Sequence, residues 1–417
     1  MNILPCLSWV PFLCTKVHEL FTPQITCDRD LPYEIIADIL SRLPAECIFL
    51  CGRSCKPLRA LTRTPFFVGM HLNRATPLIT FQYYSTYFDI QTNSCVREIT
   101  INFTDGVTRN IVSKSIKIDL TLAPGRKDLV PVLYGSYNGF LLFKILDFDS
   151  VLFLLNPITQ EQVSVVPHCQ SYFVRGFFFH STAKEYRVLY VAMKGNQFEF
   201  VILSLMTKSS RFITRSSYPP TGLRSPTIVN GVLHWMISDA SYMDARGFNP
   251  SCENSIVTFD IYSEEVSTLP HPGGQCGLRK EHHRMKLMEK DGHLCFCDDL
   301  SNCGKIVIWM LEDYKNKVWV TMRVVTFGAE PPSYMFSCVQ SSCERHRRVE
   351  ALLLYRDELL LRASYTDLFL HHTIRATTRS VDNESNLNVA AVVHINTLAS
   401  LHTDKIIFLL KEENSKL

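Results

Sequence analysis

Residues 31–75, LPYEIIADILSRLPAECIFLCGRSCKPLRALTRTPFFVGMHLNRA, decide how the chain begins to fold. Two Leu-Pro pairs, the first ending at Pro32 and the second at Pro44, enclose apolar residues at helical spacing. Pro32 suits the first turn of a helix, where its missing N–H is no loss, and Asp30 is placed to cap that turn. The pattern therefore predicts a helix from Pro32 to Leu43, which Pro44 ends.

Two further short helices are predicted behind the first. One contains small and apolar residues and is closed by Gly52: Cys47, Ile48, Leu50 and Cys51. The other has Pro57 in its first turn and contains Cys55, Leu58 and Leu61. On the first helix one face is expected to be apolar, with Ile35, Ile39, Leu40 and Leu43, and the other mostly charged, with Glu34, Asp38 and Arg42.

A helical piece of this size buries too little surface to fold well alone. Its apolar face therefore implies either a partner groove or a neighbouring domain. On periodicity alone, the segment fits equally well the N-terminal helical layer of an ordinary globular protein.

The order and spacing of these residues closely resemble an F-box, the helical module that docks onto the Skp adaptor of a cullin-type ubiquitin ligase. The residues that match the family pattern are Leu31, Pro32, Glu34, Ile35, Ile39, Leu40, Ser41, Arg42, Leu43, Pro44, Cys51, Cys55, Lys56, Arg59, Leu61, Phe67, His71, Leu72, Asn73 and Arg74. The resemblance implies that the chain binds the adaptor through Leu31, Pro32, Ile35, Ile39, Leu40, Leu43, Pro44, Ile48, Leu50, Cys51, Leu58 and Leu61.

The sequence departs from the F-box pattern in the third helix. Leu58 stands where these modules usually carry Trp, Pro57 where a Ser is usual, and Ser54 replaces an apolar residue. If the Trp position is an interface anchor, Leu58 weakens docking by about 1–2 kcal/mol.

From residue 78 onward, strand signals and two recurring kinds of turn replace the helical period. The first kind is an Asn-Gly or Asp-Gly pair before an apolar strand, in which both residues take positive φ at low cost. It occurs at Asn138-Gly139, Asn230-Gly231 and Asp291-Gly292, with Arg356-Asp357 as a degraded copy. The second kind is a polar turn joining two strands, at residues 155–159, 180–183, 205–208 and 259–263.

The alternation of these turns in units of roughly 40 to 60 residues indicates a β-propeller or a similar closed all-β array. We expect roughly six or seven blades. The same phrases resemble the F-box-associated domain, a Kelch-like domain that follows the F-box in a large plant family. The match covers most of residues 132–330 and includes the phrases at 135–139, 155–159, 175–177, 229–235, 256–260 and 308–314, with a closing strand expected at 393–401.

The predicted fold class is a small all-α three-helix F-box followed by a mainly β, β-propeller-like domain. The expected divisions are a poorly ordered N-terminal extension at 1–28, the F-box at 29–75, the β domain at 78–410 and a tail at 411–417.

Composition is that of an ordinary soluble protein, with 46% hydrophobic and 20% charged residues. A formal net charge of +3 is too small to indicate nucleic acid or an anionic membrane as a partner, and the basic clusters at 279–280 and 345–348 fit solvated loops. The 15 cysteines form no even framework, which favours reduced thiols in the cytoplasm, the nucleus or both. The N-terminus makes a poor signal peptide, and no apolar stretch is long enough to predict a membrane span.

One cysteine pattern invites a metal-site interpretation: Cys295-x-Cys297 with Cys303, near His282, His283 and His293. Its spacing differs from the usual Cys-x2-Cys pair, and alternate strand positions put the first two cysteines on one apolar face. We therefore predict core packing, no metal and no cofactor. The sequence contains no glycine-rich phosphate loop, nucleophile elbow or His-Glu-x-x-His motif, so catalytic residues are not predicted and an enzyme on a propeller scaffold is a minor alternative.

Recognition of a protein substrate is expected in loops on one face of the β domain. The longest candidates are residues 238–255 and 272–284, and substrate contacts are predicted at Tyr242, Met243, Arg246 and Phe248. The leading hypothesis is a non-catalytic substrate receptor of a Skp–cullin–F-box ubiquitin ligase. The alternative is a protein-interaction scaffold with a weakened F-box that no longer engages a ligase.

Overall fold

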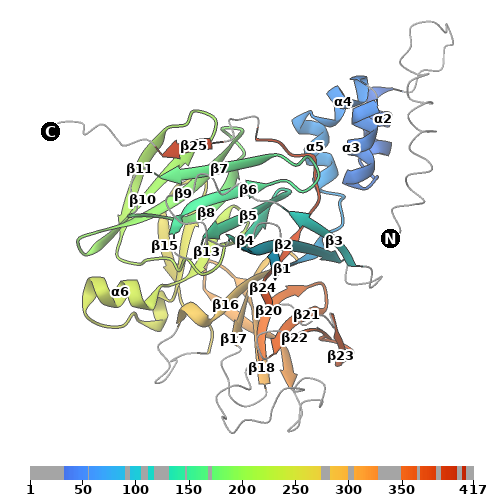
Figure 1. Cartoon of the computed structure of the whole chain (residues 1–417). Helices are drawn as coiled ribbons and strands as arrows, with labels where there is room; N and C mark the ends of the chain where they lie inside the picture. Colours follow the sequence, from blue (N-terminus) through green and yellow to red (C-terminus); the bar gives the residue numbers. More distant parts are fainter. Residues whose placement is uncertain are drawn as a thin grey trace, which may run out of the picture.

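The computed structural model describes residues 32–54, 56–89, 94–104, 111–116, 131–145, 148–167, 171–273, 282–298, 305–326, 349–363, 367–381, 387–401 and 406–409. A group of short helices stands beside a much larger β domain, and Figure 1 shows the two parts side by side. No helix in these ranges is long and apolar enough to cross a membrane.

The helical module contains four short helices in its described part. They are α2 (Tyr33–Leu40), α3 (Ala45–Ser54), α4 (Lys56–Thr62) and α5 (Pro65–Leu72). Three helices were predicted, and the structure has a fourth, because the segment that contains Phe67 is also helical. Thr64 begins α5, its hydroxyl accepting a hydrogen bond from the Phe67 amide at 3.2 Å, and Pro65 occupies the first turn.

Gly52 does not close the second helix, as had been predicted, because α3 continues to Ser54. A Cβ added at Gly52 would lie 3.3 Å from the Thr62 hydroxyl and 3.6 Å from the Arg59 Cα. The glycine therefore serves close packing of α3 against α4.

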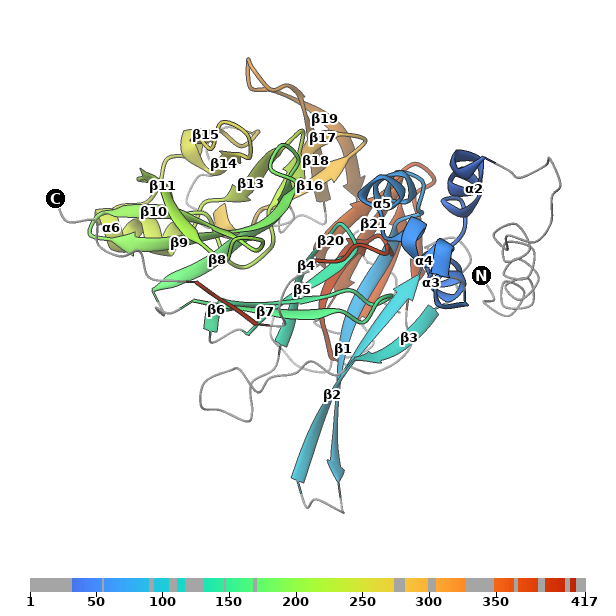
Figure 2. The same ribbon diagram turned by 90° about the horizontal axis from the view of Figure 1, so that it is seen from above.

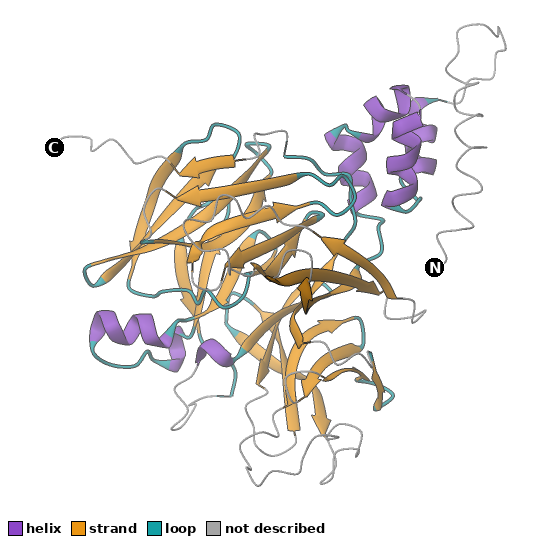
Figure 3. Cartoon of the chain, in the orientation of Figure 1, coloured by secondary structure: helices purple, strands orange, loops and turns teal. Residues whose placement is uncertain are grey.

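The β domain consists of six antiparallel sheets in its described part, which form the six blades of a β-propeller (Figures 2 and 3). Blade 1 contains β1 (Leu78–Asp89), β2 (Ser94–Thr104), β3 (Ile111–Ile116) and β24 (Leu387–His394). Blade 2 contains β4 (Pro131–Tyr137), β5 (Phe140–Ile145), β6 (Phe148–Leu155) and β7 (Gln162–Pro167), with β25 (Ile406–Leu409) parallel to β7. Blade 3 contains β8 (Tyr172–His180), β9 (Glu185–Lys194), β10 (Gln197–Ser204) and β11 (Ser210–Ser216).

Blade 4 contains β12 (Thr227–Val229), β13 (Val232–Met236), β14 (Ile256–Asp260) and β15 (Val266–Leu269). Blade 5 contains β16 (Lys286–Lys290), β17 (His293–Asp298), β18 (Lys305–Asp313) and β19 (Val318–Thr326). Blade 6 contains β20 (Val349–Tyr355), β21 (Glu358–Ala363), β22 (Asp367–His372) and β23 (Thr377–Ser380).

Blade 1 closes the ring, because it is built from both ends of the propeller sequence. β24 pairs antiparallel with β1, and Leu78 lies opposite His394. The closing strand predicted at 393–401 lies in this place, but it begins at Leu387 and ends at His394. The chain beyond it, residues 395–401, runs on without strand structure towards the helical module.

The predicted hairpin turns have the expected backbone. Both residues of Asn138-Gly139, Asn230-Gly231 and Asp291-Gly292 have positive φ, which is the conformation that tight hairpins require. In the second kind of turn a residue near the end takes positive φ: Gln160, Lys184, Lys208 and Glu264. All of these turns follow the first or the third strand of a blade.

The loop predicted at residues 238–255 contains helical structure that the sequence analysis missed. It holds α6 (Asp239–Arg246) and a short 3-10 helix, η1 (Cys252–Asn254). Ser238 caps α6 and Gly247 ends it with φ of 79°, so a standard cap at each end was present in the sequence.

Protonation of a buried histidine is expected to destabilise the propeller in mild acid. His234 is 1% exposed, and burial lowers its pKa from 6.5 to about 4. Since the unfolded chain takes up this proton first, the stabilising contribution is complete above pH 6.5 and is lost as the pH falls towards 4. We expect a loss of about 3 kcal/mol from this group over that interval.

Urea unfolding at a series of pH values tests this expectation. His234→Gln should give a flatter dependence of unfolding free energy on pH than wild type, whereas His293→Gln, at an exposed hairpin position, should keep the wild-type slope. Parallel curves for wild type and His234→Gln would contradict the assignment.

Candidate functional site

The exposed side of α2 carries an apolar pair. Ile35 is 44% and Ile39 is 45% exposed, and Tyr33 beside them is 46% exposed. Pro32 and Pro44 are exposed as well. Four of these five residues are among the predicted adaptor contacts, and they lie where a partner can reach them.

The opposite side of α2 faces inward and holds Ile36, Ala37 and Leu40. The prediction that Ile35, Ile39 and Leu40 share one face was therefore wrong. Successive helical residues are separated by about 100°, so Leu40 lies roughly 140° from Ile35 around the helix. The helix has an inner apolar face that makes the core and an outer apolar pair with no partner in the described chain.

Several other predicted adaptor residues lie inside the helical module. Leu40, Ile48, Cys51, Leu58 and Leu61 are each at most 2% exposed and belong to one hydrophobic cluster. Leu43 and Leu50 are half-buried, and Leu31 lies outside the described residues. These five buried side chains are core residues in this arrangement, and their contact with an adaptor stays a prediction.

Two of the three departures from the F-box pattern, Leu58 and Pro57, occupy different environments. Leu58 is fully buried, so its replacement of Trp changes the packing of the module core. Pro57 is exposed in the first turn of α4, where proline is well tolerated. Neither residue belongs to the exposed pair on α2.

The end of the module folds back onto its beginning. The Arg74 guanidinium forms an ion pair with Asp38 at 2.6 Å, and the His71 ring contacts the Leu43 carbonyl oxygen at 3.1 Å. Hydrogen bonds from Arg42 and Arg74 lower the pKa of Asp38 below its usual value. The His-Leu-Asn-Arg phrase therefore fixes α5 against the C-terminal end of α2.

The core of the helical module is completed by two residues of the β domain. Ile158, from the turn between β6 and β7, and Leu398, from the segment after β24, are 5% and 7% exposed and pack in the same cluster as Leu40 and Leu58. A hydrogen bond of 2.9 Å from the Asn396 amide to the Glu46 carboxylate adds a polar contact. We call this contact region, formed by residues 156–161 and 396–401 against the helices, the joint.

Asn156 organises the joint from the propeller side. Its side chain is fully buried, and its amide nitrogen donates to the carbonyl oxygens of Thr397 at 3.1 Å and Ala399 at 2.9 Å. Its amide oxygen accepts from the backbone amides of Ile158 at 2.8 Å and Thr159 at 3.2 Å. One side chain therefore shapes the turn that presents Ile158 and holds the segment that presents Leu398.

Gly139 lets this segment approach the first hairpin of blade 2. Its φ is 87°, and a Cβ at this position would lie 1.9 Å from the Thr397 hydroxyl. That hydroxyl donates to the Asn138 carbonyl oxygen at 3.2 Å. The Asn-Gly pair at this hairpin is required by the joint as well as by the turn.

The predicted recognition loop 238–255 lies on the face of the propeller away from the joint, whereas residues 274–281 of the other predicted loop lie outside the described residues. Antiparallel strands reverse direction, so connections after the first and third strands of a blade share one face and the others share the opposite face. Ile158 follows the third strand of blade 2, whereas α6 follows the second strand of blade 4. Figure 1 shows α6 and the helical module at opposite sides of the chain.

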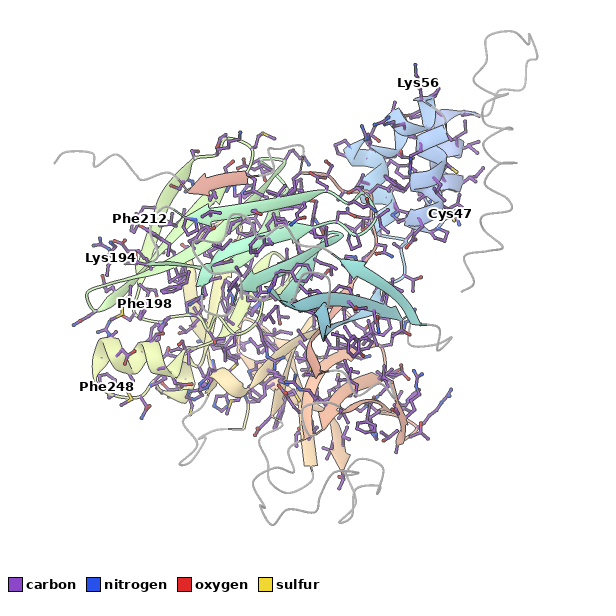
Figure 4. The ribbon with its side chains drawn as sticks, viewed as in Figure 1. Cys47, Lys56, Lys194, Phe198, Phe212 and Phe248 are labelled. Carbon is purple, nitrogen blue, oxygen red and sulfur yellow. The ribbon has the colours of Figure 1, made fainter. Side chains whose placement is uncertain are left out.

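The four predicted substrate contacts divide into two pairs. Met243 and Phe248 are 52% and 60% exposed, and Figure 4 shows Phe248 beside α6, far from Cys47 and Lys56 on the helical module. Tyr242 is 8% exposed and stacks on Tyr218 with ring centroids 5.9 Å apart. Tyr242 and Arg246, which bonds to Ser217, anchor the helix, and their contact with a substrate stays a prediction.

A cavity of about 550 Å³ occupies the centre of the propeller and is lined by residues of β4, β12, β13, β16, β20 and β24. Arg224, one of the lining residues, pairs with Glu350 at 2.6 Å, and Glu350 also pairs with Lys286 at 2.8 Å and with Arg362. Although burial opposes ionisation, these three positive charges lower the pKa of Glu350 from 4.5 to about 2. The network is charged at neutral pH and joins blades 5 and 6 to the segment that precedes β12.

Cys295 and Cys297 are fully buried among the apolar residues of blades 5 and 6. Burial raises the pKa of the Cys295 thiol to about 12, so that thiol is protonated at neutral pH. Core packing was predicted for this pair. Cys303 and the basic clusters at 279–280 and 345–348 lie outside the described residues, as do 1–28 and 411–417.

Comparison with known proteins agrees with this arrangement. A model of the F-box domain matches residues 29–68, and a model of the F-box associated beta propeller domain matches residues 113–344, more than half of the 417 residues. This chain belongs to the F-box-associated β-propeller family.

Similar members of this F-box family come from Arabidopsis thaliana. F-box protein At3g07870 is 27% identical over 317 residues, which cover 69% of this chain and 70% of that protein. F-box protein At2g23160 is 23% identical over 69% of this chain and 97% of its own length. F-box/kelch-repeat protein At3g23880 is 23% identical, covering 74% of this chain and 86% of that protein. The substrate-receptor role general to F-box proteins applies to this chain.

The joint was the functional feature that sequence reasoning missed. The phrase Leu-Asn-Pro-Ile-Thr at 155–159 was recognised as a family feature and interpreted only as a turn. The sequence did contain a signal for the joint. Ile158 is an apolar residue inside an otherwise polar turn, and Asn156, two residues earlier, can accept a hydrogen bond from its backbone amide.

Loss of the Asn156 side chain is expected to weaken the joint. Asn156→Ala leaves buried carbonyl oxygens of residues 397 and 399 without this donor, which should lower the free energy of unfolding by about 2–4 kcal/mol. Asn156→Asp keeps the acceptor for the turn but removes the donor, so it should be destabilising as well.

Urea denaturation measures the change, and limited proteolysis of the helical module reports on the joint itself. Asn316→Ala, at an exposed turn in blade 5, is the matched control and should stay near wild type. An Asn156→Ala protein as stable as the control would refute this account of the joint.

Proposed function

We propose that this chain is the substrate-recognition subunit of a Skp–cullin–F-box ubiquitin ligase. The F-box binds a Skp-type adaptor, and the propeller binds the protein that is to be ubiquitinated. The single observation that carries the proposal is the exposed pair Ile35 and Ile39 on an F-box whose core is already filled by its own chain. Exposed apolar side chains of this kind mark an interaction surface.

The proposed mechanism requires only that this chain hold the target in position. No covalent bond is made or broken by this chain. A receptor raises the effective concentration of target lysines near the ubiquitin carrier, and a fixed distance between its two binding surfaces makes this efficient. The joint supports such a role because Ile158 and Leu398 belong to the core of the helical module. The opposite-face placement of α6 leaves its exposed Met243 and Phe248 clear of the F-box.

We propose that this work takes place in the cytoplasm, the nucleus or both. Support comes from a cysteine-rich sequence with no even disulfide framework, which favours a reducing compartment.

Adaptor binding can be separated from folding because the outer pair of α2 is exposed. Ile35→Asp/Ile39→Asp should reduce recovery of the co-expressed Skp adaptor at least about tenfold, since charged groups would be placed in the apolar contact. The unfolding free energy should change by less than about 1 kcal/mol, because both side chains already face water.

Pull-down with quantitative immunoblotting of adaptor and cullin is the measurement. Ile374→Asp, at a position 59% exposed in blade 6, makes the same chemical change elsewhere and should retain both partners. Failure of the wild-type chain to recover any adaptor would sink the proposal. Recovery of the adaptor without cullin would instead favour the scaffold alternative.

Target recognition is expected to depend on the exposed residues beside α6. Met243→Asp/Phe248→Asp should abolish turnover of the target while leaving adaptor binding intact, because the two surfaces lie on opposite faces. Quantitative proteomics should find proteins that accumulate when the chain is deleted. Their levels should return to normal with wild type and not with this variant. Full restoration by the variant would place target binding elsewhere.

A further inference from the structure

Three metal-ligating side chains from separate segments meet at the edge between blades 4 and 5. Cys252 lies in η1 after α6, His271 follows β15, and His282 begins η2 (His282–Arg284) just before β16. One potential ligand atom from each residue lies within 4.8 Å of those from the other two. All three segments belong to the propeller face that carries α6.

His282 uses one ring nitrogen outside this cluster and keeps the other buried. Its side chain is 1% exposed, and its Nδ1 donates to the Asp239 carboxylate at 2.7 Å. The Nε2 atom is buried and makes no regular hydrogen bond. A buried polar atom without a partner costs about 1–3 kcal/mol, so a ligand at this place would remove a penalty.

His271 is oriented in the same way. Its side chain is 7% exposed, and its Nδ1 donates to the Pro272 carbonyl oxygen at 2.7 Å. The ring stacks on Phe296 with centroids 5.5 Å apart, and it lies 5.5 Å from the His282 ring. Because Nδ1 is the donor in both histidines, the neutral form of each ring keeps the lone pair on Nε2.

The surroundings supply the outer groups that a metal site needs. Histidines that bind metals usually donate their other N–H to a carboxylate or a backbone carbonyl, as His282 and His271 do here. Asp239 is itself held by the His283 backbone amide at 3.0 Å.

We infer that Cys252, His271 and His282 bind a divalent zinc ion. One thiolate and two imidazoles are a donor set that zinc prefers, with a water or a further ligand in the fourth tetrahedral position. Zinc bonds of about 2.0–2.3 Å require donor atoms roughly 3.3–3.6 Å apart, so the three side chains need only a small closure. The ion would tie the α6 segment to the crossing from blade 4 to blade 5. The inference does not depend on ligase membership.

Metal content of the purified, tag-free full chain tests the site directly. After dialysis against metal-free buffer, elemental analysis of wild type should find about one zinc per chain. Cys252→Ser and His282→Gln should each lower this to background, while His293→Gln, at an exposed hairpin position, should keep it. Wild-type zinc content in both site variants, or its loss from the control, would overturn the assignment.

Two measurements keep the test decisive if the site variants fold poorly. In wild type, zinc added after chelation should raise the thermal unfolding midpoint and magnesium should not. Cobalt substituted for zinc should give the visible absorption of a tetrahedral site with a sulfur charge-transfer band, and Cys252→Ser should lose that band. A wild-type chain whose unfolding midpoint and cobalt spectrum show no metal binding would refute the site.

Discussion

Asn156 uses all of its hydrogen-bonding groups inside the protein, and the relation between the two domains depends on that arrangement. Its oxygen shapes the turn that presents Ile158, and its nitrogen holds the segment that presents Leu398. Both apolar side chains then enter the core of the F-box. Separation of the two domains would expose this core and break the hydrogen bond from Asn396 to Glu46, whereas Asn156 holds together the two β-domain segments that contact the F-box.

The propeller separates its tasks by face because antiparallel connections alternate between its two ends. The joint occupies the face formed after the first and third strands of a blade, whereas α6 and the three metal-ligating residues occupy the other. Glu350 and its three cationic partners join blades 5 and 6 to the segment that precedes β12.

Local patterns in the sequence predicted most of the fold. The residue types at Asn230-Gly231 predicted its positive φ and marked the position of a hairpin. The number of blades, six, lies within the six or seven that were expected. Contacts between distant residues could not be predicted. Ile158 and Leu398 lie 240 positions apart, and Cys252, His271 and His282 have no short metal-binding spacing. On α2 the prediction of a single apolar face was wrong, because the apolar residues lie at different angles around the helix and form two faces.

The shared core has a consequence for how the protein is made. The F-box helices are synthesised early, but Leu398 and the strand β24 that closes the ring emerge only near the end. A product cut short before residue 387 lacks both the closing strand and the side chain that completes the F-box core. The hydrophobic core of the F-box is therefore complete only when the propeller is complete as well.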